Sequence, residues 1–184
     1  MIKRIFSQTW EVFFSNLSLL VLQTILMEVI YFLLYKFTII GGEILRCFFI
    51  AGMYNVIFKK EKKEFDDLFI GFKNKFLAKN ILLYEIIVIL GSILGGILLI
   101  IPGLYFFIST IFALPIIVKE KIDVISAIKL SMKFFNKNIP ISLLAILFII
   151  IINGIAIFPY GLLSIFTVPF SICLIGKLWE VLSS

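Results

Sequence analysis

The sequence predicts an all-α membrane protein with six transmembrane helices, arranged as three hairpins. Of its 184 residues, 62% are hydrophobic and the mean hydropathy is +1.18, whereas soluble domains are about half apolar. Long apolar runs alternate with short basic segments along the chain. Because one span takes about 20 residues, residues 1–184 leave no room for a separate soluble domain. We therefore treat the chain as a single transmembrane domain.

The apolar runs are continuous and show no alternation of polar and apolar positions, so they predict helices rather than strands. Tight turns at Gly41, residues 101–103 and residues 159–161 are expected to reverse the chain within each hairpin. The six predicted spans are residues 17–38, 42–58, 81–101, 104–118, 139–158 and 162–182.

Basic residues are concentrated on one side of these spans. Fifteen of the 17 Lys and Arg fall in residues 1–16, 59–80, 119–138 and the C-terminal tail. Since basic residues collect in cytoplasmic loops, we expect a multi-pass protein of the cytoplasmic (inner) membrane with both termini in the cytoplasm. The first apolar run is longer than a secretory signal core, and we interpret it as a retained anchor.

A segment rich in basic and aromatic residues precedes the first, third and fifth spans and ends at Asn16, Asn80 and Asn138. Each asparagine is placed to cap the helix that follows. The pattern predicts three copies of one unit, an amphipathic interfacial helix followed by a hairpin, around a pseudo-threefold axis. The alternative is that any six-span protein with basic cytoplasmic loops shows such segments.

Residues 123–137 and 64–79 are expected to form two of these interfacial helices, each with an apolar and a basic face. Asp123 could cap the start of the later one. A basic face suits anionic lipid headgroups or a membrane-protein partner, and we expect no nucleic-acid partner because the net charge of +6 reflects topology. The candidate lipid-facing residues are Lys129, Lys133, Lys137, Lys73, Lys75 and Lys79.

Several polar side chains fall inside the predicted spans, where a charge is costly and needs a partner. We expect a pair between Arg46 and either Glu28 or Glu43. These groups could line a proton or ion path, or could fix helix packing through hydrogen bonds. The candidate intramembrane polar site comprises Glu28, Glu43, Arg46, Glu85 and Asn153. Gly91 and Gly95 form a small-xxx-small pattern that predicts close helix contact.

The sequence predicts no enzyme. There is no histidine, and Cys47 and Cys173 are far apart in apolar runs, so we expect no metal site and no disulfide. Nucleophile–base pairs, phosphate-binding glycine loops and HExxH helices are absent from the sequence. We therefore expect no catalytic residues and no cofactor.

Four short motifs follow in order: the stretch from Phe65 to Lys73, the turn that ends at Gly103, Ala127 to Ser131, and Pro159-Tyr-Gly ahead of Pro169. With them the chain resembles a loose group of bacterial six-helix membrane proteins of unknown function. The group includes YciC-type proteins and the membrane domain found with glycerophosphodiester phosphodiesterases. The resemblance spans roughly residues 45–182 and implies architecture, and no phosphodiesterase catalytic residues are present.

Three functions remain open from the sequence. The first is a non-enzymatic envelope-maintenance or accessory protein that binds a partner. The second is a small transporter or channel with Glu28 and Arg46 in its path. The third is an immunity protein against a membrane-active toxin.

Overall fold

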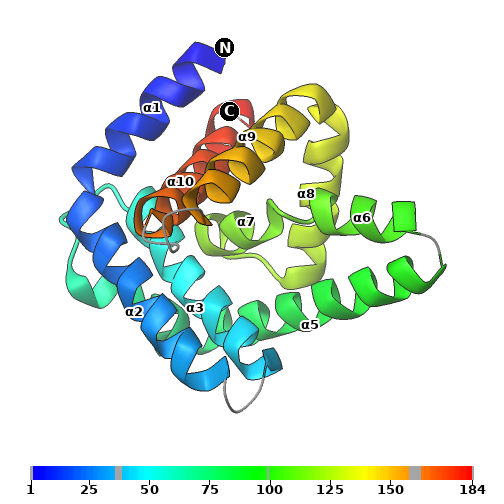
Figure 1. Ribbon diagram of the computed structural model, residues 1–184, viewed down its shortest axis with the longest axis horizontal. Helices are drawn as coiled ribbons and strands as arrows, with labels where there is room; N and C mark the ends of the chain where they lie inside the picture. The colour runs from blue at the N-terminus through cyan, green and yellow to red at the C-terminus, as the bar shows by residue number, and fades with distance from the viewer. Residues whose placement is uncertain (1, 36–38, 99, 158–162, 184) are drawn as a thin grey trace.

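The computed structural model describes residues 2–35, 39–98, 100–157 and 163–183, and within these ranges the chain is helical with no strand (Figure 1). One 3-10 helix, η1 (Phe65–Phe69), and ten α-helices follow one another. The α-helices are α1 (Ile2–Ser15), α2 (Leu17–Tyr35), α3 (Ile39–Phe58), α4 (Ile70–Lys73), α5 (Lys75–Leu98), α6 (Ile100–Ser109), α7 (Ala113–Glu120), α8 (Val124–Lys137), α9 (Ile139–Ile157) and α10 (Ser164–Ser183).

Four described segments are long and apolar enough to cross a membrane: α5, α6 with α7, α9 and α10. A fifth is possible if α1 and α2, which meet at a bend of 78°, are counted as one broken span. The expectation of an all-helical chain with several spans is therefore confirmed, and these helices are consistent with a multi-pass membrane protein.

The core lies around α7, which Figure 1 places among α3, α8 and α10. All six residues from Ala113 to Val118 are buried. In α10 the buried run extends from Pro169 to Gly176 and resumes at Leu178 and Trp179. A helix that is apolar on every side is suited to the centre of a bundle rather than to its surface.

The predicted fourth span is broken, which the sequence did not indicate. Helix α6 ends at Ser109 and α7 begins only at Ala113, with turn residues 110–112 between them. The Ser131 hydroxyl of α8 donates to the Ser109 carbonyl at 2.7 Å, and the Tyr84 hydroxyl of α5 donates to the Thr110 carbonyl at 3.3 Å. The Thr110 carbonyl also accepts from the Ala113 N–H at 2.9 Å, so the carbonyls at the break have partners, as a break inside a membrane segment requires.

Two of the predicted turns lie inside helices. Gly41 belongs to α3, and Pro102 and Gly103 belong to the first turn of α6. Proline is tolerated there because the first residues of a helix have no intrahelical acceptor for their N–H groups. The third predicted turn, residues 159–161, lies outside the described residues.

The three asparagines do not cap the helices that follow them, so that prediction is wrong. Each side-chain amide instead donates backwards to the carbonyl four residues earlier: Asn16 to Val12, Asn80 to Phe76 and Asn138 to Phe134, at 2.7–3.0 Å. Asn16 and Asn138 lie at breaks between helices, whereas Asn80 lies within α5.

Residues 64–79 do not form the single amphipathic helix that was expected. They comprise η1, the short α4 and the start of α5, whose first turn is capped by the Asn74 side chain. Leu68 is fully buried, and its carbonyl accepts from Gln23 Nε2 of α2 at 3.1 Å. A Cβ on Gly52 would lie 1.9 Å from this carbonyl oxygen, so the segment can insert only beside a glycine.

Helices α5 and α6 form the close pair that Gly91 and Gly95 predicted. A Cβ on Gly95 would approach the Gly103 Cα to 2.6 Å, and one on Gly91 would approach the Phe106 ring to 2.4 Å. The far ends of these two helices project from the bundle (Figure 1) and expose apolar side chains. Their glycines hold the backbones together where little else contacts them.

Candidate functional site

Part of the predicted intramembrane polar site is assembled between α2, α3 and α5. Glu43 accepts a hydrogen bond from the Tyr31 hydroxyl at 3.0 Å and lies 4.0 Å from Arg46 on the same helix. The Arg46 guanidinium also lies 5.8 Å from the centre of the Tyr31 ring, a cation–π distance. The Glu43–Arg46 alternative is therefore the one that forms.

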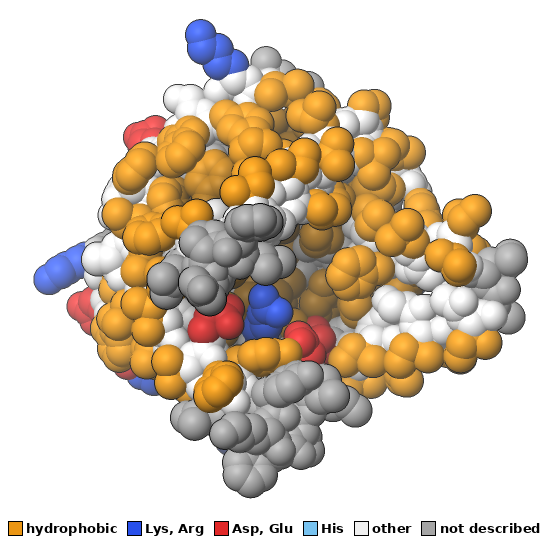
Figure 2. All heavy atoms as spheres, in the orientation of Figure 1, with side chains coloured by type: hydrophobic (Ala, Val, Ile, Leu, Met, Phe, Trp, Pro, Cys, Tyr) orange, Lys and Arg blue, Asp and Glu red, His pale blue; other side chains and the backbone are white. Residues whose placement is uncertain are grey.

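The same cluster extends to α5 through a thiol. Cys47 Sγ donates to Glu85 Oε2 at 2.7 Å. Figure 2 shows acidic and basic side chains gathered in a hollow of a largely apolar face, over α3. The Glu43 and Arg46 side chains are each more than a third exposed, so the cluster is open to the surroundings of the protein.

Two predicted members of the site lie elsewhere. Among the described residues, Glu28 forms no ion pair and no side-chain hydrogen bond, so the Glu28–Arg46 alternative does not form. Asn153 joins α9 to α10: it donates to Ser171 Oγ at 2.8 Å and accepts from Thr167 Oγ1 at 3.0 Å. These bonds satisfy the amide and fix the packing of two helices.

Helix α8 matches its prediction closely. Asp123 Oδ2 accepts from the Ser126 N–H at 3.0 Å, and this backbone hydrogen bond holds the pKa of Asp123 below its usual value. Val124, Ala127, Ser131 and Phe134 are among its buried residues.

The lysines of α8 lie on the opposite side of the helix and are exposed. Lys129, Lys133 and Lys137 have no ion pair within the described part of the chain. A buried apolar face and an unneutralised basic face thus occur on one helix, as at a membrane surface.

The lysines of the earlier segment have more varied surroundings. Lys73, Lys75 and Lys79 are exposed, and Lys73 pairs with Asp66. Nearby, Lys59 binds both carboxylate oxygens of Asp67 at 2.8 Å. Although burial works to raise the pKa of Asp67, the bond from Lys59 lowers it, and the same bond raises the pKa of Lys59. This pair anchors the start of η1 to the end of α3.

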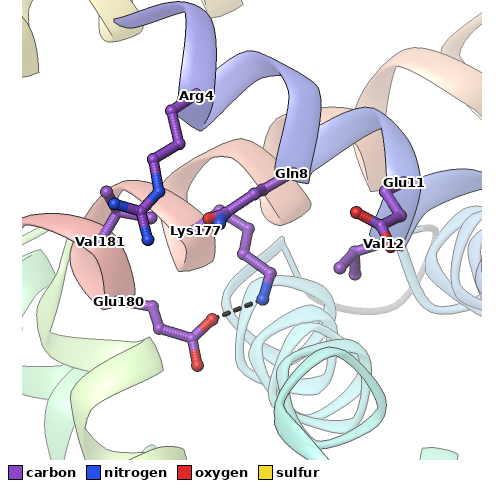
Figure 3. A pocket seen from close by; sticks show the side chains of 7 residues that line it. All are labelled: Arg4, Gln8, Glu11, Val12, Lys177, Glu180 and Val181. Atoms are coloured by element: carbon purple, nitrogen blue, oxygen red, sulfur yellow. Dashed lines mark hydrogen bonds and ion pairs between the residues drawn. The ribbon is translucent and has the colours of Figure 1, made fainter. Parts of the chain in front are cut away.

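A polar cleft of about 350 Å³ lies between α1 and α10 and was not predicted (Figure 3). Arg4, Gln8 and Glu11 line it from α1, and Lys177 and Glu180 line it from α10. The first three recur at helical steps along one face of α1, a signal that the sequence does contain. The facing residues of α10 could not be found from the sequence, because their approach depends on tertiary packing.

The charges of this cleft are largely compensated within the protein. Glu180 is bound by Lys177 at 2.5 Å and by Lys119 at 3.4 Å. Lys63 lies close enough for the positive charge of Lys177 to act on it: burial, and then this charge, lower the pKa of Lys63. Glu11 lies at the end of the cleft away from Arg4 (Figure 3). The cleft is therefore a network of opposite charges, lined by two cations and two anions.

No group of three or more metal-ligating side chains occurs among the described residues. Cys47 and Cys173 are both free thiols. The assembled polar groups can exchange protons, bind ions or hold anionic groups. The fold is therefore consistent with a helical membrane protein that has polar groups within and beside its helices. Scans against protein-family models, curated proteins and solved structures each found no match.

Proposed function

We propose that the protein is a non-enzymatic, multi-pass protein of the cytoplasmic membrane that acts as an accessory factor, binding anionic lipids or a membrane-protein partner at its basic face. The observation that carries this proposal is α8. Its lysines, Lys129, Lys133 and Lys137, are exposed and have no ion pair among the described residues, while its opposite face is buried against the helices of the core.

The proposal includes six spans: α2, α3, α5, α6 with α7, α9 and α10. Helices α2 and α3 have 19 and 20 residues, about 28–30 Å at 1.5 Å per residue, which matches the hydrocarbon thickness of a bilayer. The basic segments then face the cytoplasm with both termini. In this arrangement α8 and the polar side of α1 meet the cytoplasmic leaflet.

Native mass spectrometry of the full chain, purified in a mild detergent, tests this proposal. We expect a defined lipid or protein to remain bound at fixed stoichiometry. The triple variant Lys129→Gln, Lys133→Gln, Lys137→Gln should lose it. A control triple variant at Lys3, Lys60 and Lys62 removes the same charge from other exposed positions and should keep it. A wild-type protein that carries neither lipid nor partner would exclude a stable accessory role.

A second function, transport of an ion or proton, is favoured by the Glu43–Arg46–Cys47–Glu85 cluster. Its ionisable groups lie within the proposed spans and at a hollow of the surface. Intramembrane charges of this kind often mark a path. Because Glu28 lies outside the cluster, Glu85 replaces it as the residue to test.

Flux measured in liposomes distinguishes this function from the first. If the protein transports, Glu85→Gln should abolish flux while the variant remains folded, and Glu28→Gln should leave flux nearly unchanged. Equal flux in empty and protein-containing liposomes, across protons and common cations, would reject transport.

A further inference from the structure

A small pocket between α8 and α10 differs from the other basic regions. Its volume is about 210 Å³, and Leu130, Lys133, Phe134 and Lys137 of α8 and Trp179, Leu182 and Ser183 of α10 line it. No acidic side chain lines it. Because Lys133 and Lys137 are four residues apart, one helical turn, they lie on the same side of α8.

The indole of Trp179 adds a second feature. Its side chain is 5% exposed and packs against the Phe134 ring, with the ring centres 5.0 Å apart. Its Nε1–H is buried and has no acceptor among the described residues. Buried donors of this kind are rare because a buried N–H without an acceptor loses its hydrogen bond to water and gains none in return. Since Trp179 lines the pocket, an acceptor oxygen that entered to the depth of this donor would supply the missing partner.

We propose that this pocket binds the headgroup of a single anionic phospholipid, whose phosphate is held by Lys133 and Lys137 and whose oxygens accept from the Trp179 indole. This inference rests on the proposed function and names its binding site. Charge complementarity favours an anion, since two unpaired ammonium groups meet no carboxylate there. The apolar lining from Leu130, Phe134 and Leu182 favours a lipid over a free anion, because it gives the glycerol and first methylene groups a surface to cover.

The neighbouring cleft between α1 and α10 does not compete for this role. Its lysine is already bound to Glu180, and a phosphate would have to displace that carboxylate. Lys129 lies one turn before Lys133 on the basic face but does not line the pocket. The pocket therefore predicts that Lys133 and Lys137 matter more for lipid binding than Lys129. A general attraction of lysines to anionic membranes predicts no such difference.

Tryptophan fluorescence gives a direct test, because the chain has two tryptophans and Trp10→Phe leaves Trp179 as the reporter. The full chain in detergent is titrated with dihexanoyl-phosphatidylglycerol, dihexanoyl-phosphatidylcholine and inorganic phosphate. We expect a saturable shift of Trp179 emission with phosphatidylglycerol at one lipid per protein. The other two should bind at least tenfold more weakly.

Variants then locate the site. Lys133→Gln with Lys137→Gln should weaken phosphatidylglycerol binding about tenfold or more, as expected for the loss of charge-assisted hydrogen bonds. Lys60→Gln with Lys62→Gln, an equal change of charge elsewhere, should not weaken it. Lys133→Arg with Lys137→Arg keeps both charges and should retain binding, which controls for misfolding. Trp179→Phe, followed by native mass spectrometry, should weaken binding several-fold.

Three results would overturn the proposal. Unchanged binding in the double glutamine variant would show that the lipid binds elsewhere. Unchanged binding in Trp179→Phe would remove the indole from the site. Equal affinity for inorganic phosphate would replace the lipid with a free anion. If instead only the triple variant that includes Lys129 loses its lipid, the pocket is wrong while the proposed function stands.

Discussion

Helices α1 and α8 are similar in sequence character but differ in how they are held. Each has 14 residues, and each ends beside an asparagine whose amide donates to the carbonyl four residues earlier. Each also lines a cavity against α10. The cavity beside α1 contains acidic groups that compensate its cations, whereas the pocket beside α8 contains none.

Their anchoring differs as well. Three residues of α1 are buried, compared with six of α8. The first N–H of α8, at Val124, donates to Asn80 of α5, and Ser131 reaches the broken span α6–α7. Helix α8 is thus part of the core and keeps a free basic face. Helix α1 lies along α10 and keeps its charges within the protein.

The largest expected difference between the two helices is in stability. Phe134→Ala should lower the free energy of unfolding by about 3–5 kcal/mol, since Phe134 packs between Phe112 and Trp179. Phe13→Ala should cost less, because Phe13 borders an open apolar groove of about 360 Å³ that lipid or detergent can fill. Denaturant unfolding in detergent measures both. Equal losses would contradict the difference in anchoring.

The hydrogen bond from the Val124 N–H at the start of α8 to Asn80 should have the next largest effect on stability. Asn80→Ala removes the acceptor of the buried Val124 N–H and should cost about 1–3 kcal/mol. Asn16→Ala should cost less stability, because the Asn16 side-chain amide donates to Val12 and Ser15 of the same helix, α1. Unfolding of the two variants under the same conditions is the measurement, and a larger loss for Asn16→Ala would reverse the comparison.

Removing the acid from the α1–α10 cleft should make it resemble the α8 pocket. In Glu180→Gln, the ammonium groups of Lys119 and Lys177 lose their carboxylate. We expect a second phosphatidylglycerol to bind, seen as a new adduct in native mass spectrometry. Glu61→Gln, at an exposed position, changes the charge equally and should not create it. The absence of a second adduct would show that compensation by Glu180 is not what excludes the anion.

The smallest effect is a dependence on pH that originates at the start of α8. The pKa of Asp123 is lowered by its backbone hydrogen bond from Ser126. Its contribution to stability is therefore present above the unfolded pKa of about 3.9 and is lost as pH falls through the lower folded pKa. Asp123→Asn, which keeps a capping oxygen, should flatten the acid limb of stability between about pH 5 and 2. If the acid limb of the stability curve is unchanged in this variant, the loss of stability at low pH originates from other carboxyl groups such as Asp67.

Features that depend only on residues close together in the chain were predicted well from the sequence. The fifth predicted span, residues 139–158, corresponds to α9 at Ile139–Ile157, and the Asp123 cap and the Gly91–Gly95 contact were found from local patterns. Continuous apolar runs and capping residues carry that information directly.

Features that depend on distant residues could not be predicted. At the break between Ser109 and Ala113, hydroxyls of the distant residues Ser131 and Tyr84 donate to the Ser109 and Thr110 carbonyls, and nothing near residue 110 indicates those partners. Asn80 was expected to cap its own helix but instead binds Val124, 44 residues later. The pocket lined by Lys133 and Trp179 likewise lies between α8 and α10, and only tertiary packing sets the register of these two helices.

The proposed function requires the α8 lysine face to lie on the cytoplasmic side of the membrane, and side-specific cysteine labelling determines the side. In a background with Cys47→Ser and Cys173→Ser, single cysteines replace Lys133 on α8 and Leu163, an exposed residue ahead of α10. A membrane-impermeant maleimide should label Lys133→Cys only in inside-out vesicles and Leu163→Cys only in right-side-out vesicles. Labelling of Lys133→Cys in right-side-out vesicles would place the lysine face outside the cytoplasm and rule out the proposed topology.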